Sequence, residues 1–366
     1  MKILDVTPDD RSAAYGHAPA HYLSPDRRDP VKRLWEEPVN HRVIAAAVDA
    51  LPASSRPLRV LDVGAGTGDG LALLEGGLAL SSDPGRPIHY VGLDPDPVMI
   101  ETARAAHADR PDVEFVLGDV RDDLPVDDVD LHLSAGVPWS HLRHAEFRGA
   151  LTGVLAAAAR RRGPTAVVVD VLGRYSIEWT TRWALDAWDY RMSFFHGAGE
   201  GDDAVAMPMS VHSRRTVAAA LEAAAHETGT VLRSVTFHDR SVMVGRHTTT
   251  GAFTPDLPEY RSLVNRLHDG DVTLDLDRLR FTAPTVDAPA EIADFFATLE
   301  PAWNARVAAA AAHEAAAGPA AAVRTGLAAG LREVEHRLQR GLGAAHSLIG
   351  VAIVAPRGGG PTDGAG

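Results

Sequence analysis

A glycine-rich segment directly follows a short apolar run near residue 60 and offers the clearest chemistry in the chain. It reads Asp62-Val63-Gly64-Ala65-Gly66-Thr67-Gly68. Glycine allows a tight turn and lets a ligand approach main-chain atoms closely. The dinucleotide-binding pattern G-x-G-x-x-G is not met, because Asp69 stands where its last glycine would be. The segment therefore predicts a small-molecule site in which backbone atoms contact the ligand.

Two further carboxylates end the next two apolar runs. Asp94 closes IHYVGLD and Asp119 closes VEFVLGD. An aspartate at a strand end is also common as a turn or helix cap, so neither residue is specific by itself. Open α/β sheets bind ligands at the carboxyl ends of their strands. Together with Asp62, the two residues place three acids at one such edge, which favours a binding site over three unrelated caps.

The pattern D-x-G-x-G-x-G, with the two later acids, resembles the motifs of class I S-adenosylmethionine-dependent methyltransferases over about residues 58–247. The resemblance implies that Asp94 binds both ribose hydroxyls of S-adenosylmethionine, and that Asp119 and the Val120 amide contact the adenine. We expect Asp62 to reach the ammonium group of the cofactor, and S-adenosylhomocysteine to be the product. The expected cofactor-binding set is Asp62, Gly64, Ala65, Gly66, Gly68, Asp94, Pro95, Asp119, Val120 and Ser134.

Methyl transfer mainly needs alignment of the acceptor, and it needs a base only where a proton must leave early. We expect catalytic groups among His141, Tyr175 and Glu178, and substrate contacts from Trp139, Trp179, Tyr190 and His196. For His141, solvation at a helix start is the alternative.

The aromatic residues of 173–211 are open to two interpretations. Together with a carboxylate they suit a cationic or amine acceptor. The i, i+4 spacing of Trp179 and Trp183 equally fits one face of a core helix. The loop Gly136-Val137-Pro138-Trp139 faintly resembles the Pro-then-aromatic loop of amino-methyltransferases, which gives slight weight to nitrogen as the acceptor atom.

Strands that alternate with helices predict an α/β, Rossmann-like, doubly wound sheet of seven strands. The final strand pair is expected around His238-Asp239, and the run Ser347–Val354 is expected to add a strand at a sheet edge. We divide the chain into an N-terminal lid (1–57), a cofactor domain (58–249) containing a substrate-covering insert (173–211), a mostly helical C-terminal extension (250–355) and a disordered tail (356–366).

Composition restricts the partners. The net charge of −13 disfavours nucleic acid as a substrate, because phosphate contacts need a basic surface. The chain has no cysteine, which removes thiolate chemistry, and no metal-binding arrangement can be assigned. It has no run of about 18 apolar residues and no apolar core in its first 22 residues, so we expect a cytoplasmic protein without a membrane span or signal peptide.

The sequence thus predicts a methyltransferase for a small-molecule acceptor, acting on nitrogen or oxygen in bacterial secondary metabolism. A protein or peptide methyltransferase that docks its substrate on the extension is the first alternative. A cofactor-binding protein with non-methylating chemistry is the second. A stripe from Val323 to Leu338 at helical spacing predicts a core or interhelical seam, and a homodimer through this stripe is a further hypothesis.

Overall fold

A computed structural model describes residues 28–191, 206–245, 253–254 and 256–357. Its centre is a twisted sheet whose first half is parallel, in the order β3-β2-β1-β4-β5. The expected α/β fold is confirmed. Short apolar runs form these strands because helices cover both faces of the sheet, and every residue of the fifth strand is buried. The five strands are β1 (Leu58–Val63), β2 (Ile88–Asp94), β3 (Val113–Leu117), β4 (Leu131–Leu133) and β5 (Thr165–Gly173).

The antiparallel part of the sheet differs from the expectation. Residues around His238-Asp239 do not form a hairpin; they belong to one strand, β8 (Thr230–Arg240). Its partner is β9 (Ser347–Pro356), which lies between β8 and β5 and pairs with both, not at an edge. A domain boundary near residue 249 would therefore cut through one sheet. Residues 241–346 are an insertion between two neighbouring strands.

Within the described residues, a second antiparallel pair brings the sheet to nine strands, where seven were expected. It consists of β6 (Ala187–Arg191) and β7 (Ala206–His212). The strand β7 joins the sheet through Leu172 and Gly173, the last two residues of β5. These two strands, which belong to the insert 173–211, thus extend the sheet at the end where β5 finishes.

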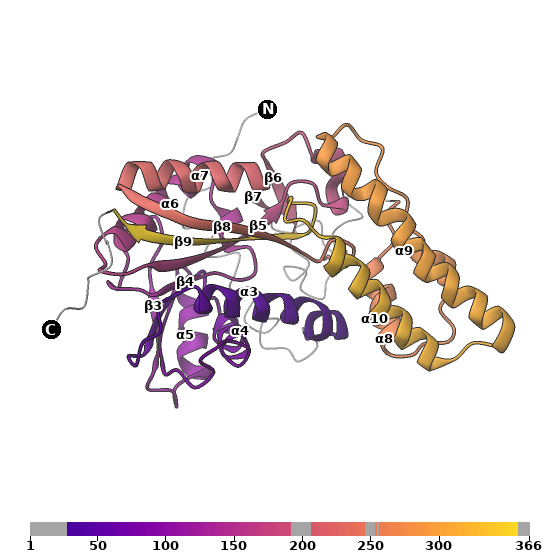
Figure 1. Cartoon of the computed structure of the whole chain (residues 1–366), viewed down its shortest axis with the longest axis horizontal. Coiled ribbons are helices and arrows are strands. Elements are labelled where there is room, and N and C mark those ends of the chain that lie inside the picture. Colours follow the sequence, from indigo (N-terminus) through magenta and orange to yellow (C-terminus); the bar gives the residue numbers. More distant parts are fainter. Residues whose placement is uncertain (1–27, 192–205, 246–252, 255, 358–366) are drawn as a thin grey trace.

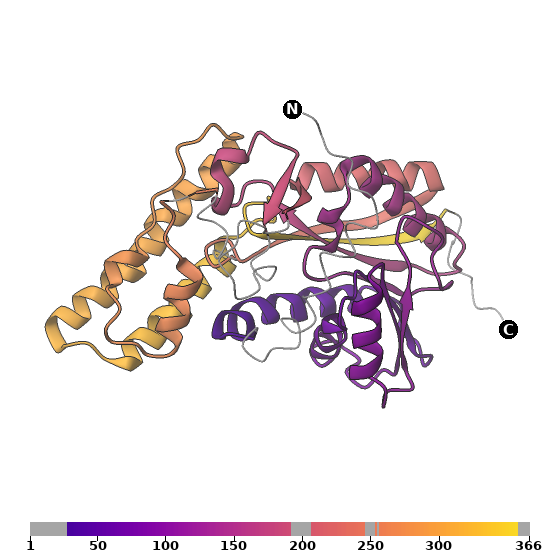
Figure 2. The same ribbon diagram turned by 180° about the vertical axis from the view of Figure 1, so that it is seen from behind.

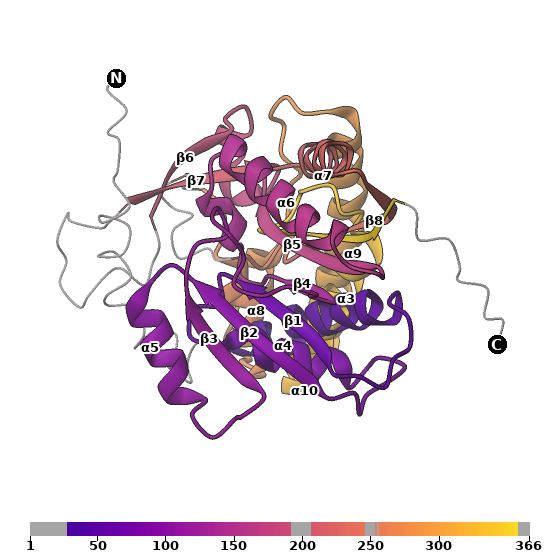
Figure 3. The same cartoon turned by 90° about the vertical axis from the view of Figure 1, so that its left-hand side faces the viewer.

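Two groups of helices enclose the sheet, as Figure 3 shows. Asp96 caps α5 (Pro97–Ala106) by accepting the backbone N–H groups of Val98 and Met99. Ser213 caps the start of α7 (Arg214–Thr228), and Gly229 ends it in the left-handed conformation. Aliphatic side chains from each helix group form a separate core on either face. One face carries α3 (Glu37–Asp49), α4 (Asp69–Leu78) and α5 (Pro97–Ala106), and the other carries α6 (His144–Ala159) and α7 (Arg214–Thr228).

The insertion between β8 and β9 forms a helical arm, defined here as residues 256–340, which projects from one end of the sheet (Figures 1 and 2). Gly318 ends the first long helix, and the predicted stripe is buried at Leu327, Leu331 and Val334. The arm contains α8 (Tyr260–His268), the 3-10 turn η7 (Leu276–Leu279), α9 (Ala290–Ala317) and α10 (Ala321–Leu338).

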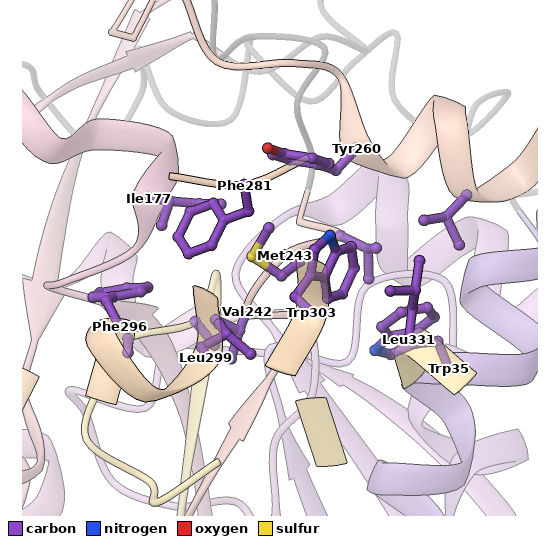
Figure 4. Packing of buried hydrophobic residues seen from close by; sticks show 14 of the residues in the cluster. Trp35, Ile177, Val242, Met243, Tyr260, Phe281, Phe296, Leu299, Trp303 and Leu331 are labelled. Carbon is purple, nitrogen blue, oxygen red and sulfur yellow. The ribbon is translucent and has the colours of Figure 1, made fainter. Parts of the chain in front are cut away.

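A third core joins the arm to the rest of the molecule (Figure 4). Trp35, in the π-helical turn η2 (Lys32–Glu36), is fully buried there. Its indole N–H donates to Oε1 of Glu335 on α10 at 2.8 Å, and its ring lies 6.4 Å from that of Trp303 on α9. The segment expected to form an N-terminal lid is therefore anchored on the arm at Trp35, and its helix α3 packs on the sheet; residues 1–27 lie outside the described part.

Candidate functional site

The glycine-rich turn lies between β1 and α4, where it holds three glycines in the left-handed region. The Gly64 N–H donates to the Leu93 carbonyl at 2.9 Å, which ties the turn to β2. A side chain on Gly64 would overlap Pro138, so glycine is required where the loop after β4 crosses. A side chain on Gly66, at φ +54°, would meet no atom within 4 Å. The turn is therefore covered by Pro138 at Gly64 and uncovered at Gly66, where a ligand can contact the backbone.

Asp94 lies at the carboxyl end of β2 and faces this turn. Its Oδ2 accepts the Gly66 N–H at 2.9 Å, and its Oδ1 accepts the Asp96 N–H at 2.9 Å. A carboxylate has about four lone-pair positions, so one remains on each oxygen. Burial raises the pKa of Asp94 to about 6, and the nearby Asp96 and Asp119 add to the shift. The remaining lone pairs suit two hydroxyl donors from a ligand diol.

Asp62 is the more deeply buried carboxyl, with 2 % of its surface exposed. The Tyr90 hydroxyl donates to its Oδ2 at 2.5 Å. Burial raises the pKa of Asp62 to about 7, and the charges of Asp94 and Asp69 contribute to the rise. A buried carboxyl of this kind gains most from a cationic ligand group, because the cation offsets the cost of its ionisation.

Asp119 follows β3 and forms an ion pair with Arg121. Arg121 donates to it from Nε at 3.0 Å and from Nη2 at 2.6 Å. The second arm of Arg121 donates to Glu146 at 3.0 Å. An adenine amino group would therefore share Asp119 with Arg121. Val120 is half-buried beside it, and Pro95, after β2, is exposed.

The loop after β4 lies beside the glycine-rich turn and is held in place by hydrogen bonds to Ser134 and Asp170. Ser134 accepts the Trp139 indole N–H at 2.9 Å and the Asp170 backbone N–H at 3.0 Å, and it donates to a carbonyl of β5 at 2.9 Å. Gly136 donates its N–H to Oδ2 of Asp170 at 2.8 Å. Val137 has φ +62°, a strained value for a β-branched residue. Such strain persists only where surrounding contacts enforce it, so this loop has a defined shape.

The structure places several expected acceptor residues in the core. Trp139 is 1 % exposed and packs edge-on against Phe147, so it is a packing residue beneath the loop. Trp179 and Tyr190 are also buried, with ring centroids 6.2 Å apart. His196 lies outside the described residues. These positions correspond to the second interpretation of the aromatic residues, a packed core, although Trp179 lies in the 3-10 segment η4 (Ile177–Arg182) and not in an α-helix.

The three expected catalytic residues have different surroundings. His141 ends the 3-10 turn η3 (Pro138–His141) and is half-buried. Tyr175 is half-buried and packs edge-on against Trp183. Glu178 is 1 % exposed, and its Oε2 lies 2.6 Å from Nδ1 of His346. Sequence reasoning missed His346, because only the pairing of β9 with β5 carries it to Glu178.

Among the described residues, no group of three or more metal-binding side chains is placed to hold a metal ion. In the same part of the chain, every helix is too short or too polar to span a bilayer.

Comparison with known proteins identifies the family of part of the chain. Residues 60–168 match a family model described as a methyltransferase domain. This region belongs to the class I S-adenosylmethionine-dependent methyltransferase superfamily. S-adenosylmethionine is accordingly the cofactor of the domain. Asp94, Asp62 and the open turn at Gly66 fit its diol, its ammonium group and its main-chain contacts. When bound, the cofactor supplies an electrophilic methyl group.

Solved structures of low similarity include other methyltransferases. A Haloferax volcanii structure of the Trm112 methyltransferase activator in complex with a methyltransferase shows 16% identity over 94% of this chain and 97% of that one, with a TM-score of 0.41. The CcbJ methyltransferase of Streptomyces caelestis shows 18% identity over 57% and 87% of the two chains, with a TM-score of 0.39. The [4+2]-cyclase SpnF shows 16% identity over 87% and 81%, with a TM-score of 0.38. Among curated proteins, none matches.

Proposed function

We propose that this chain is an S-adenosylmethionine-dependent methyltransferase whose acceptor is a small molecule. The proposal rests on one observation: the turn at Gly66, the carboxyls of Asp62 and Asp94, and the loop at Gly136 meet at the carboxyl edge of the sheet. Asp94 holds the ribose diol, and Asp62 meets the ammonium group. The chain's part in the reaction is mainly to orient the two reactants, since alignment supplies most of the rate gain in such a displacement.

The position of the arm supports a small acceptor. Arg240, the last residue of β8, and Ser347, the first of β9, both pair at the level of Leu172 near the end of β5. The arm therefore leaves the sheet at the edge that carries the cofactor residues. An elaborate, tightly packed insertion at this edge suits recognition of one compact acceptor. The acidic net charge of −13 supports a partner other than nucleic acid.

Substitution of Asp94 tests the cofactor site. Loss of a charge-assisted partner costs roughly 1.5–3 kcal/mol, so Asp94→Ala should weaken S-adenosylhomocysteine binding by about 10- to 150-fold in calorimetry. Asp109→Asn is the matched control, because Asp109 is exposed in the turn after α5. Unchanged affinity of Asp94→Ala, with the fold intact, would contradict the proposal.

The acceptor class is tested separately. The wild-type protein is incubated with labelled S-adenosylmethionine and panels of phenols, alcohols, amines and peptides, and products are identified by mass spectrometry. We expect methylated small molecules. Transfer to peptides alone would replace the small-molecule proposal with the peptide alternative.

A further inference from the structure

Glu178 and His346 form a close pair that the cofactor site does not use. The two residues are 168 positions apart, and the Glu178 Oε2 to His346 Nδ1 distance is 2.6 Å. Ser176 also donates to the same oxygen at 3.3 Å. An ionised carboxylate only accepts hydrogen bonds, so the proton of a neutral imidazole lies on Nδ1 and its lone pair on Nε2. The pair thus fixes both the tautomer and the orientation of the ring.

The environment holds the carboxylate firmly and leaves part of the His346 side chain exposed. Glu178 is 1 % exposed, and a side chain on Gly245 would come within 2.5 Å of its Oε2. The His346 side chain keeps 12 % of its surface exposed. Within the described ranges, no group hydrogen-bonds its Nε2. The Trp179 ring, 5.7 Å from the imidazole, packs beside it.

The pair lies at the same edge as the cofactor residues, through a short chain of contacts. Ser347, next to His346, donates to Oδ1 of Asp170, and Oδ2 of Asp170 accepts the Gly136 N–H. The His346 carbonyl also accepts the N–H of Gly173, the last residue of β5. His346 is thus one residue away from the network that shapes the loop after β4.

We propose that His346 is the general base for the acceptor and that Glu178 is its positioning residue, so that the acceptor atom is the oxygen of an alcohol or phenol. This inference rests on the proposed function. As the acceptor oxygen bonds to the methyl carbon, the carbon–sulfur bond breaks and its electron pair stays on sulfur. The hydroxyl proton passes to Nε2 of His346, and Glu178 stabilises the imidazolium. A neutral amine attacks through a free lone pair and needs no such base.

An ion pair with only a structural role is the competing explanation. A buried carboxylate needs a partner, and His346 satisfies Glu178 whether or not it moves a proton. The two explanations differ in pH dependence. A structural pair affects stability alone, whereas a general base sets the acid limb of the rate profile, which disappears when the base is removed.

The experiment measures kcat and kcat/KM against pH for the wild type and for His346→Gln and Glu178→Gln, with a hydroxyl acceptor found in the panel. His346→Gln should lower kcat by about 100- to 10,000-fold, as loss of a general base typically does. Glu178→Gln should lower kcat more than it changes KM for the acceptor, because it removes the group that orients the imidazole. Glu178→Asp should restore part of the rate. His89→Gln is the matched control, because His89 is exposed near the start of β2, at the opposite edge.

Calorimetry with S-adenosylhomocysteine and thermal denaturation accompany each variant. We expect cofactor affinity to stay within about twofold for His346→Gln, since the residue is assigned to the acceptor. An unchanged rate and pH profile in a folded His346→Gln protein would overturn the inference, as would a wild-type protein that methylates only amines. A wild-type protein that methylates nothing would instead remove the proposed function itself.

Discussion

Cofactor binding should release protons, because the two carboxyls assigned to it are partly protonated in the free protein. The pKa of Asp62 is raised to about 7 and that of Asp94 to about 6, in both cases mainly by burial. At pH 6.5 these values leave roughly three-quarters of a proton on Asp62 and one-quarter on Asp94. A ligand that brings an ammonium to one carboxylate and a diol to the other favours both ionised forms. Binding should then release about one proton at pH 6.5 and about 0.1 at pH 8.

Calorimetry in two buffers of different ionisation enthalpy measures this number directly. S-adenosylhomocysteine is the ligand, because it carries both the amino group and the diol, and its amino group is largely protonated at pH 6.5. Asp62→Asn should reduce the release at pH 6.5 to roughly one-quarter of a proton, the share of Asp94. A release near zero in the wild type, or an Asp62→Asn protein that releases as much as the wild type, would refute the assignment of the ammonium to Asp62.

The raised pKa of Asp62 also makes the free energy of unfolding depend on pH. The native state binds the Asp62 proton more tightly than the unfolded chain does, so the contribution to stability is complete in acid and is lost as pH rises towards about 7. Asp62→Asn removes this trend. Urea unfolding without ligand should show the variant gaining on the wild type between pH 5 and pH 8, by about 2.6 kcal/mol. A wild-type protein that gains stability relative to the variant over this range would contradict the raised pKa.

Two further substitutions test local packing. Trp35→Phe removes the N–H that Glu335 accepts at 2.8 Å and should lower the free energy of unfolding by about 1–3 kcal/mol in urea. Trp188→Phe is the control and should cost less, because the Trp188 indole N–H has no partner within the described residues. Equal losses would argue against the hydrogen bond. Gly70→Ala places a methyl group onto the carboxyl of Asp62 and should weaken S-adenosylhomocysteine binding at least about tenfold by calorimetry. Unchanged affinity would show that the position of the Asp62 carboxyl does not matter for ligand binding.

The parallel half of the sheet and its glycine-rich turn could be predicted because both depend on local sequence. A buried parallel strand reads as a continuous apolar run, and the turn after β1 has a glycine wherever a side chain would strain or block it. The acids Asp62 and Asp94 lie at strand ends, so the predicted strands already placed them at one edge. The ion pair between Arg121 and Asp119 could not be predicted, because that contact depends on side-chain geometry.

The antiparallel half could not be predicted from local pattern. After Ser347 the strand β9 is apolar because both its faces are buried, and nothing in such a run distinguishes a central strand from an edge strand. More than 100 residues separate β9 from β8, its neighbour in the sheet. The aromatic residues around Trp179 were equally ambiguous, since a packed core and an aromatic binding wall have the same composition.

The insertion between β8 and β9 is therefore more than an attached module. Its two ends are neighbouring strands, so the arm cannot shift at these ends without disturbing β9, which pairs with β5 over eight residues. The first residue of β9, Ser347, hydrogen-bonds Asp170, and the residue before it, His346, contacts Glu178. A change in the packing of the arm would thus reach the acceptor side of the site before it reached Asp62 and Asp94, which belong to β1 and β2. Variation in the arm can alter acceptor choice while the cofactor residues stay in place, as expected where specificity and cofactor binding are carried by separate elements of one sheet.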